Sequence, residues 1–164
     1  VLIDPMPMSA HDLEHLRSLG GAALIVVTNS DHTRVAHELQ GVFGAKLLGP
    51  VAEKGVFAAD RWIEDGEEIV PGLSALEMQG SKTPGELALL LEESTLITGD
   101  LIRGHRGGAL NLLPDEKLTD KEAAIESVRR ILEHDAIDAV LVGDGWPIFY
   151  DGHAKLGELV DQGG

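Results

Sequence analysis

Cysteine is absent from the 164-residue sequence, which excludes disulfide bonds, thiolate metal sites and a cysteine nucleophile. The sequence also lacks an apolar run of the roughly 18–20 residues that a membrane-spanning helix needs. Its first residues show no charged segment followed by an apolar stretch, so they do not resemble a secretory leader. We therefore expect a cytoplasmic protein with no membrane contact.

Basic residues are scarce, because 13 Lys and Arg stand against 28 Asp and Glu, for a formal net charge of −15. Such a charge argues against nucleic acid as the main partner, since the phosphate backbone would be repelled. A small-molecule substrate or ligand is the expected partner, and the Leu-rich helices would support a homodimer. The length and the 43% hydrophobic content suit a single globular domain over residues 1–164.

Short apolar segments alternate with amphipathic ones along the chain, which is typical of an α/β (α+β) fold. Buried strands are predicted at residues 1–3, 22–27, 46–48, 62–63, 68–70, 73–78 and 139–142. Helices are predicted at residues 9–19, 35–43, 119–134 and 155–160. Ser9 is the expected N-cap of the first helix, and Thr119 opens the expected capping box of the third.

Three further segments have less regular patterns. Residues 87–91 and 96–98 flank a short turn and are expected to form an antiparallel hairpin. Glycines at both ends of residues 104–108 make the 104–113 segment the expected mobile loop. Trp62 and Trp146 could line a pocket, but we expect them to pack in the core, the usual place of a tryptophan.

Acidic or histidine side chains directly follow four of the predicted strands, namely Asp4, Asp31 with His32, Asp100 and Asp144. Ligands of α/β sheets bind beyond the carboxyl ends of the strands. One such aspartate is usually only a cap or turn residue. Four in one chain favour a common site at this edge of the sheet.

A common site of this kind needs positive charge. Two carboxylates ~4 Å apart repel by roughly 4 kcal/mol at an effective dielectric constant of 20. Three carboxylates around His32 therefore require a metal ion, a shared proton or a basic side chain. Lys82, Arg34 and Arg103 are the candidate basic side chains, because each lies in a loop near one of these acidic residues.

Five short motifs occur in order along the chain: V-L-I-D-P, V-T-N-S-D-H, S-K-T-P-G, L-I-T-G-D and V-G-D-G. In this order they resemble the motifs of the metallo-β-lactamase superfamily of metal-dependent hydrolases, from Val1 to about Asp144. The resemblance implies a four-layer αβ/βα sandwich with mixed sheets. The opening strands of that family are not visible, and Val1 already lies in an apolar run, so further residues are expected upstream.

The sequence departs from the family at the first metal site. The resemblance places the histidine ligands of that metal at Val27, Asn29 and Lys82, and none of these residues suits zinc. The first metal site is therefore expected to be lost. The resemblance implies that the ligands of the second metal are Asp31, His32, Asp100 and Asp144. This oxygen-rich set would take one divalent ion, with Zn²⁺, Mn²⁺ and Fe²⁺ as the candidates.

Two interpretations follow from these departures. In the first, the chain is a mononuclear metal-dependent hydrolase of an ester, lactone or thioester, and Asp31, Lys82 and Asp100 are catalytic. In the second, Lys82 replaces a metal and pairs with Asp100, no metal is bound, and the chain is a non-catalytic small-molecule-binding or structural protein. The residues expected to support the site from around it are Asp4, Asn29, Arg34, Thr83 and Arg103.

Overall fold

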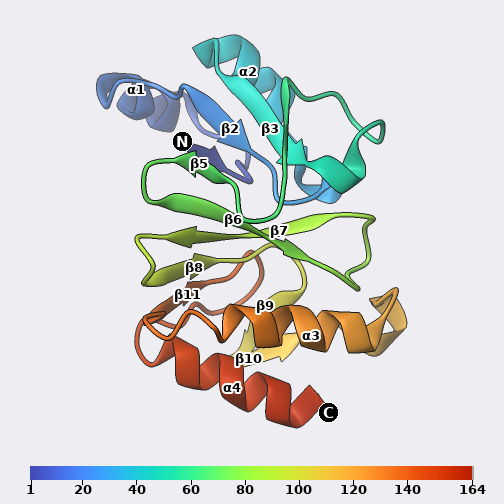
Figure 1. The fold of residues 1–164 in the computed structure, drawn as a ribbon. Helices are drawn as coiled ribbons and strands as arrows, with labels where there is room; N and C mark the ends of the chain where they lie inside the picture. Colours follow the sequence, from blue (N-terminus) through green and yellow to red (C-terminus); the bar gives the residue numbers. More distant parts are fainter. Residues whose placement is uncertain (164) are drawn as a thin grey trace. The chain divides into compact units, whose positions relative to one another are not determined.

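The computed structural model describes residues 1–163. Its contacts divide the chain into two compact units, Val1–Ile63 and Glu64–Gly164. Each unit has its own sheet and helices (Figure 1). The predicted organisation of residues 1–164 as a single domain stays a prediction.

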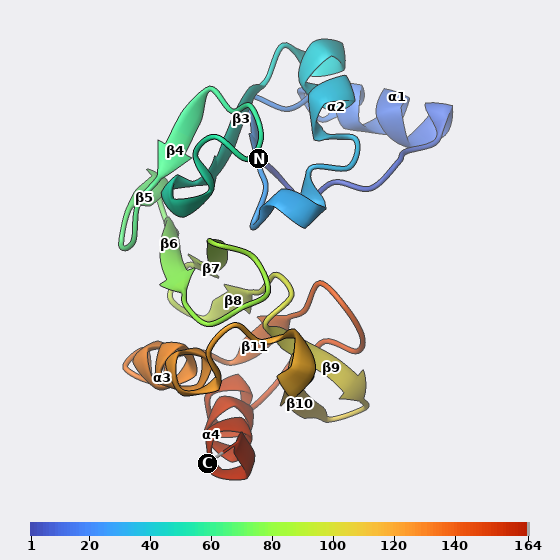
Figure 2. The same cartoon turned by 90° about the vertical axis from the view of Figure 1, so that its right-hand side faces the viewer.

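A parallel sheet with the strand order β1-β2-β3-β4 forms the first unit. Its strands are β1 (Leu2–Ile3), β2 (Leu24–Val26), β3 (Lys46–Pro50) and β4 (Arg61–Ile63). The connecting helices are α1 (Ala10–Ser18) and α2 (Ala36–Phe43), and Figure 2 shows both on the same side of β3 and β4. Parallel strands require such crossover connections.

Local signals explain where these helices begin and end. The Ser9 side chain accepts a hydrogen bond from the backbone of Asp12, whose carboxylate bonds back to Ser9, so the predicted N-cap is confirmed as a capping box. Gly44 ends α2 with a left-handed φ of 65°, which costs glycine little. Beneath the helices, Ile25 and Leu47 are fully buried, as the apolar strand segments predict.

The second unit has a mixed sheet with the order β11-β8-β7-β6-β5, in which only β11 and β8 are parallel. Its strands are β5 (Glu68–Val70), β6 (Leu73–Met78), β7 (Glu86–Leu91), β8 (Thr95–Ile97) and β11 (Ala139–Leu141). The expected antiparallel hairpin is formed by β7 and β8.

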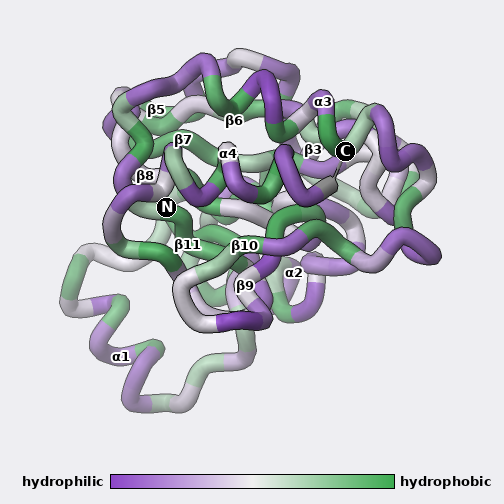
Figure 3. Tube along the Cα trace, turned by 90° about the horizontal axis from the view of Figure 1, so that it is seen from below, coloured by the Kyte–Doolittle hydropathy of each residue, from purple (hydrophilic) through white to green (hydrophobic). Residues whose placement is uncertain are grey.

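Two helices and a hairpin pack on this sheet. They are α3 (Lys121–Ile131), α4 (Gly152–Gly163), β9 (Ile102–Arg106) and β10 (Ala109–Leu112). Helix α3 contacts β6, whereas α4 contacts β10, β11 and α3 (Figure 1). Figure 3 shows hydrophobic and hydrophilic stretches alternating along α4 and a hydrophobic β11, as expected for one buried helix face and a core strand. Short 3₁₀ turns occur at Ser30–His32, Val51–Glu53 and Asp115–Lys117.

Three local predictions were wrong. The expected mobile loop at residues 104–113 is largely the β9–β10 hairpin, turned at Gly107 and Gly108 with a φ of 78° at Gly108. Asp120, not Thr119, caps α3, because its side chain accepts the backbone N–H of Ala123. The helix also ends at Ile131 instead of continuing through residue 134.

The mixed α/β fold class is confirmed by these elements. None of the helices described within residues 1–163 is long and apolar enough to cross a bilayer.

Candidate functional site

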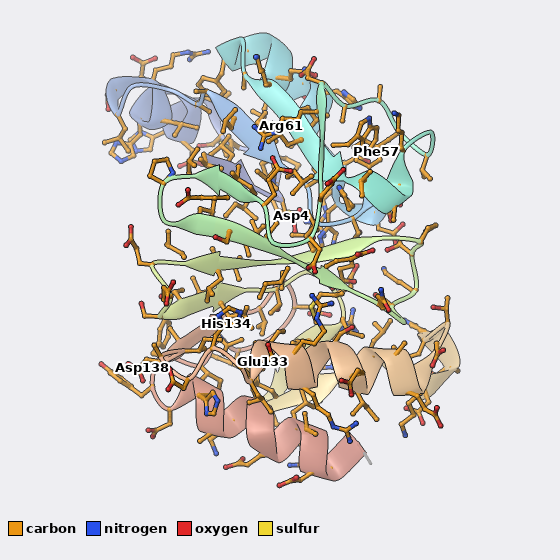
Figure 4. All side chains as sticks on the ribbon, viewed as in Figure 1. Asp4, Phe57, Arg61, Glu133, His134 and Asp138 are labelled. Atoms are coloured by element: carbon orange, nitrogen blue, oxygen red, sulfur yellow. The ribbon has the colours of Figure 1, made fainter. Side chains whose placement is uncertain are left out.

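In the first unit, one predicted site residue, His32, contacts the carboxylate of another, Asp4, which follows β1 and is labelled in Figure 4. Asp4 Oδ1 accepts the backbone N–H of Thr28 at 2.7 Å, and Oδ2 accepts the Thr28 hydroxyl at 2.6 Å. His32 Nδ1 lies 2.7 Å from the same Oδ2. Asp4 holds a left-handed φ of 45° in this position, an uncommon conformation for a residue other than glycine.

These contacts fix the tautomer of His32. A carboxylate only accepts hydrogen bonds, so the contact with Asp4 requires a proton on Nδ1. In the neutral ring the other nitrogen, Nε2, is then the acceptor or metal-ligating atom. His32 is almost fully buried, which holds the ring in this orientation.

The loop after β2 positions the remaining candidates of the first unit. Asn29 is fully buried, and its side-chain oxygen accepts the Asp31 backbone N–H at 3.0 Å, which caps the 3₁₀ turn. Asp31 is exposed on this turn. Arg34 follows it with a φ of 29°, and among residues 1–163 no ion pair of its side chain is observed.

In the second unit, charged side chains of alternating sign form a chain of contacts. Lys82 Nζ lies 3.1 Å from Asp100 Oδ2, and Arg103 Nη2 lies 3.6 Å from Asp100 Oδ1. The same Arg103 nitrogen lies 3.1 Å from Asp144 Oδ2, which His105 Nε2 also contacts at 3.1 Å. The structure thus brings together four of the predicted site residues, and the expected contact between Lys82 and Asp100 is present.

Strand register explains how Asp100 and Asp144 meet around one guanidinium. Strands β8 and β11 are parallel neighbours, with Ile97 opposite Leu141. Asp100 follows Ile97 at the same separation along the chain as Asp144 follows Leu141, so both carboxylates emerge at the same edge. The turn that carries Asp100 is closed by the Thr98 hydroxyl, which donates to the Ile102 carbonyl at 2.9 Å.

Close backbone approach at Gly104 holds the Asp144 segment against β9. Gly104 donates its N–H to the Asp144 carbonyl at 3.0 Å and accepts the Trp146 N–H at 2.7 Å. A Cβ atom at Gly104 would lie only 2.1 Å from the Trp146 carbonyl oxygen. Only glycine therefore fits here, and the approach places Asp144 beside Arg103.

The two carboxylates that contact Arg103 differ in their burial. The side chain of Asp100 is 8% exposed and that of Arg103 is 13% exposed, whereas that of Asp144 is half exposed. The hydrogen bond from His105 lowers the pKa of Asp144, with smaller contributions from the charges of Arg103 and His105. Asp100 is thus the carboxylate for which a nearby cation matters most.

Sequence reasoning missed Glu86, the first residue of β7, which is 1% exposed. Its Oε1 accepts the Leu101 N–H at 2.7 Å, and its Oε2 accepts the Ser81 hydroxyl. Burial raises the pKa of Glu86 to about 7, and these two hydrogen bonds only partly oppose the rise. Ser81 precedes Lys82, and Leu101 follows Asp100. Glu86 therefore connects, through hydrogen bonds, the two turns that carry the ion pair between Lys82 and Asp100.

The motif around Lys82 is held by its own turn. The Thr83 hydroxyl donates to the Gly85 carbonyl at 2.9 Å, so Thr83 supports the backbone of the 81–85 segment. The role of Thr83 in supporting a site stays a prediction. The predicted catalytic roles of Asp31, Lys82 and Asp100 stay predictions.

Comparison with known proteins identifies the family. Residues 1–162 match the family described as "Metallo-beta-lactamase superfamily". The chain belongs to the metallo-β-lactamase superfamily. Among curated protein sequences, none matches this chain.

Solved structures of metallo-β-lactamase fold share the architecture. DIM-1 metallo-beta-lactamase is 16% identical, with 99% of this chain and 81% of that chain covered and a TM-score of 0.73. A metallo-beta-lactamase from Pontibacter korlensis is 15% identical, with coverages of 98% and 80% and a TM-score of 0.72. TTHA1623 in a di-iron-bound form is 19% identical, with coverages of 94% and 83% and a TM-score of 0.67. At these identities the likeness shows a shared fold alone.

One of these solved structures holds two iron ions, and the side chains of this chain differ from what a metal requires. Within each unit, over the described residues, no three His, Cys, Asp or Glu side chains group in a way that would hold a metal ion. In the second unit an ammonium contacts Asp100 and a guanidinium contacts Asp144, and both groups repel metal cations. The donors of the second unit therefore do not fit a metal. Metal binding by the predicted set Asp31, His32, Asp100 and Asp144, which draws two residues from each unit, stays a prediction.

Proposed function

We propose that this chain is a metal-independent member of the metallo-β-lactamase superfamily that binds a small molecule. In this proposal the Lys82 ammonium stands where relatives place the first metal. The observation that supports it is the 3.1 Å contact between Lys82 Nζ and the buried Asp100 carboxylate. Arg103 adds a second cation on the other oxygen of Asp100.

The electrostatics of this contact disfavour a divalent ion next to Lys82. A dication ~4 Å from an ammonium would be repelled by roughly 8 kcal/mol at an effective dielectric constant of 20. Asp100 would also have to exchange its contact with Lys82 for one with the metal. A fixed monocation thus supplies the charge that Asp100 needs, and it does so without a metal.

A second candidate function is supported by a different observation. Asp4 Oδ2 lies 2.7 Å from His32 Nδ1, and a carboxylate bonded to this ring nitrogen commonly orients a metal-ligating histidine. In this candidate the chain is a mononuclear hydrolase of an ester, lactone or thioester. His32 would then be a ligand of one divalent ion, Zn²⁺, Mn²⁺ or Fe²⁺, which would supply an activated water.

The nature of the ligand is proposed from charge. The net charge of −15 is unfavourable for nucleic acid and for an anionic membrane surface, so a small molecule is the proposed ligand. The lack of cysteine supports the cytoplasm as the proposed location.

Hydrolysis assays separate the two candidates. The full chain is incubated with ester, lactone and thioester substrates, with and without added Zn²⁺ or Mn²⁺, beside a His32→Ala variant. A metal-independent binding protein gives no turnover above the His32→Ala background in either condition. Turnover that depends on the metal and disappears in His32→Ala would overturn the proposal and favour the hydrolase.

A further inference from the structure

The segment between β11 and α4 carries exposed aromatic side chains in a chain with only 4% aromatic residues. Trp146 is 67% exposed, Phe149 60% and Tyr150 78%. The expectation that Trp146 packs in the core is therefore wrong. We propose that residues 146–150, here called the aromatic loop, form the surface through which two copies of this chain associate.

The backbone of the aromatic loop is held at several points. Ile148 pairs with Val140 through two hydrogen bonds of 2.8 and 2.9 Å, and Trp146 donates to Gly104 at 2.7 Å. After the loop, Asp151 donates its N–H to the Asp138 carboxylate at 2.9 Å, and Figure 4 labels Asp138 near the start of α4. The aromatic side chains are thus displayed from an ordered backbone, which lowers the entropy cost of binding a partner.

The exposure of these side chains favours a flat partner over a small ligand. Sites for small molecules are concave and bury most of the ligand, whereas side chains that are 60–78% exposed stand out from the surface. Trp and Tyr are enriched among the residues that dominate protein–protein binding energy. The three side chains expose on the order of 400 Å², about half of what each partner buries in a standard interface.

Charges around the aromatic loop favour a second copy as that partner. A symmetric dimer needs a surface that is complementary to itself. At the Trp146 end, the adjacent β9–β10 hairpin exposes Arg106, for which no side-chain partner is observed within residues 1–163. At the Tyr150 end, Asp138 and Asp151 are exposed and acidic. A two-fold axis through the loop would bring Arg106 of each copy towards the acidic end of the other.

Sedimentation equilibrium of the full chain from roughly 5 to 500 µM tests the proposal. We expect a monomer–dimer equilibrium with a dissociation constant in the micromolar range, because the apolar area is modest. Intrinsic fluorescence gives a second readout in a Trp62→Phe variant, whose sole tryptophan is Trp146. Its emission should shift to the blue as the concentration rises, since the indole leaves water in the dimer.

Matched variants locate the interface. Trp146→Ser and Tyr150→Ser should each weaken dimerisation at least tenfold, and Arg106→Glu should weaken it several-fold. Leu19→Ser removes an apolar side chain that is 70% exposed outside the loop and should leave the dissociation constant unchanged. A chain that stays monomeric over the whole range overturns the proposal. Equal weakening by Leu19→Ser, or a dimer that persists in Trp146→Ser and Tyr150→Ser, overturns it as well.

Discussion

Lys82 and Asp100 form the central ion pair of the second unit, with Nζ 3.1 Å from Oδ2. The two residues come from different turns, one before β7 and one after β8. The Asp100 side chain is 8% exposed and that of Lys82 is 28% exposed, so the pair is only partly shielded from water. Removal of the ammonium leaves a buried carboxylate that still contacts the Arg103 guanidinium at 3.6 Å.

Lys82→Ala is expected to lower the free energy of unfolding by about 1–3 kcal/mol. Loss of one partner of a fully buried pair costs about 3–5 kcal/mol, and the partial exposure of Lys82 reduces this. Lys121→Ala is the matched control, because it removes a lysine 3.0 Å from Asp115 in an exposed pair. The control should cost about 0–1 kcal/mol in urea denaturation. Equal costs for the two variants would contradict a structural role of the Lys82 contact.

Glu86 is expected to make stability depend on pH near neutrality. Burial raises its pKa from 4.5 to about 7, so between these values the folded chain binds a proton that the unfolded chain releases. The stabilisation is present below pH 4.5 and is lost as pH rises through about 7. Over this pH range the free energy of unfolding is expected to fall by about 3 kcal/mol.

The Glu86→Gln variant isolates this effect, because glutamine does not titrate. Urea denaturation at several pH values should show that wild-type stability falls, relative to Glu86→Gln, between about pH 5 and about pH 8. Glu122→Gln, an exposed position in the first turn of α3, should keep the wild-type slope. Parallel curves for wild type and Glu86→Gln would show that Glu86 is ionised throughout.

Asp4 is expected to fix the protonation of His32. Nitrogen-15 NMR should detect a proton on His32 Nδ1, which lies 2.7 Å from Asp4. Asp4→Asn should lower stability by about 1.5–3 kcal/mol, because hydrogen bonds to a charged group are lost. The exposed Glu38→Gln serves as the neutral control in the same unit. A neutral His32 protonated on Nε2 in the wild type would contradict this geometry.

Gly104 and Gly107 offer a matched pair of substitutions in one hairpin. A Cβ at Gly104 would lie 2.1 Å from the Trp146 carbonyl, whereas nothing lies within 4 Å of a Cβ at Gly107. Gly104→Ala should therefore destabilise the chain by about 3 kcal/mol or more, because overpacking must displace backbone. Gly107→Ala should stay within about 1 kcal/mol of wild type. Thermal unfolding of both variants gives the comparison, and similar melting temperatures would contradict the close approach.

Parts of the fold and site follow from simple sequence rules. An apolar run without alternation predicted β2, because a buried parallel strand is apolar on both faces. Short apolar segments next to turn residues predicted most of the other strands. Asp100 and Asp144 could be expected to meet, since each follows a strand at the same edge of a sheet. The need of clustered carboxylates for a cation made Lys82, Arg34 and Arg103 candidates, and the resemblance to the superfamily singled out the pairing of Lys82 with Asp100.

Other features depend on tertiary contacts that the sequence does not reveal locally. Glu86 begins a run of apolar residues, and nothing in that run shows that its carboxylate would bind two separate turns. Residues 104–108 are rich in glycine and charge, a loop-like composition, yet backbone pairing with β10 makes a strand of Ile102–Arg106. Trp146 is exposed, and its backbone pairs with Gly104, a contact between segments that lie far apart in the sequence.

Metal content tests most directly whether Lys82 stands in the place of a metal ion. The full chain is purified without chelators, dialysed against zinc and then against buffer, and measured by elemental analysis beside Lys82→Ala and Lys121→Ala. We predict far less than stoichiometric zinc in wild type and Lys121→Ala, and more zinc in Lys82→Ala, where the repelling ammonium is gone. Stoichiometric zinc in the wild type, unchanged in Lys82→Ala, would contradict the proposed role of Lys82.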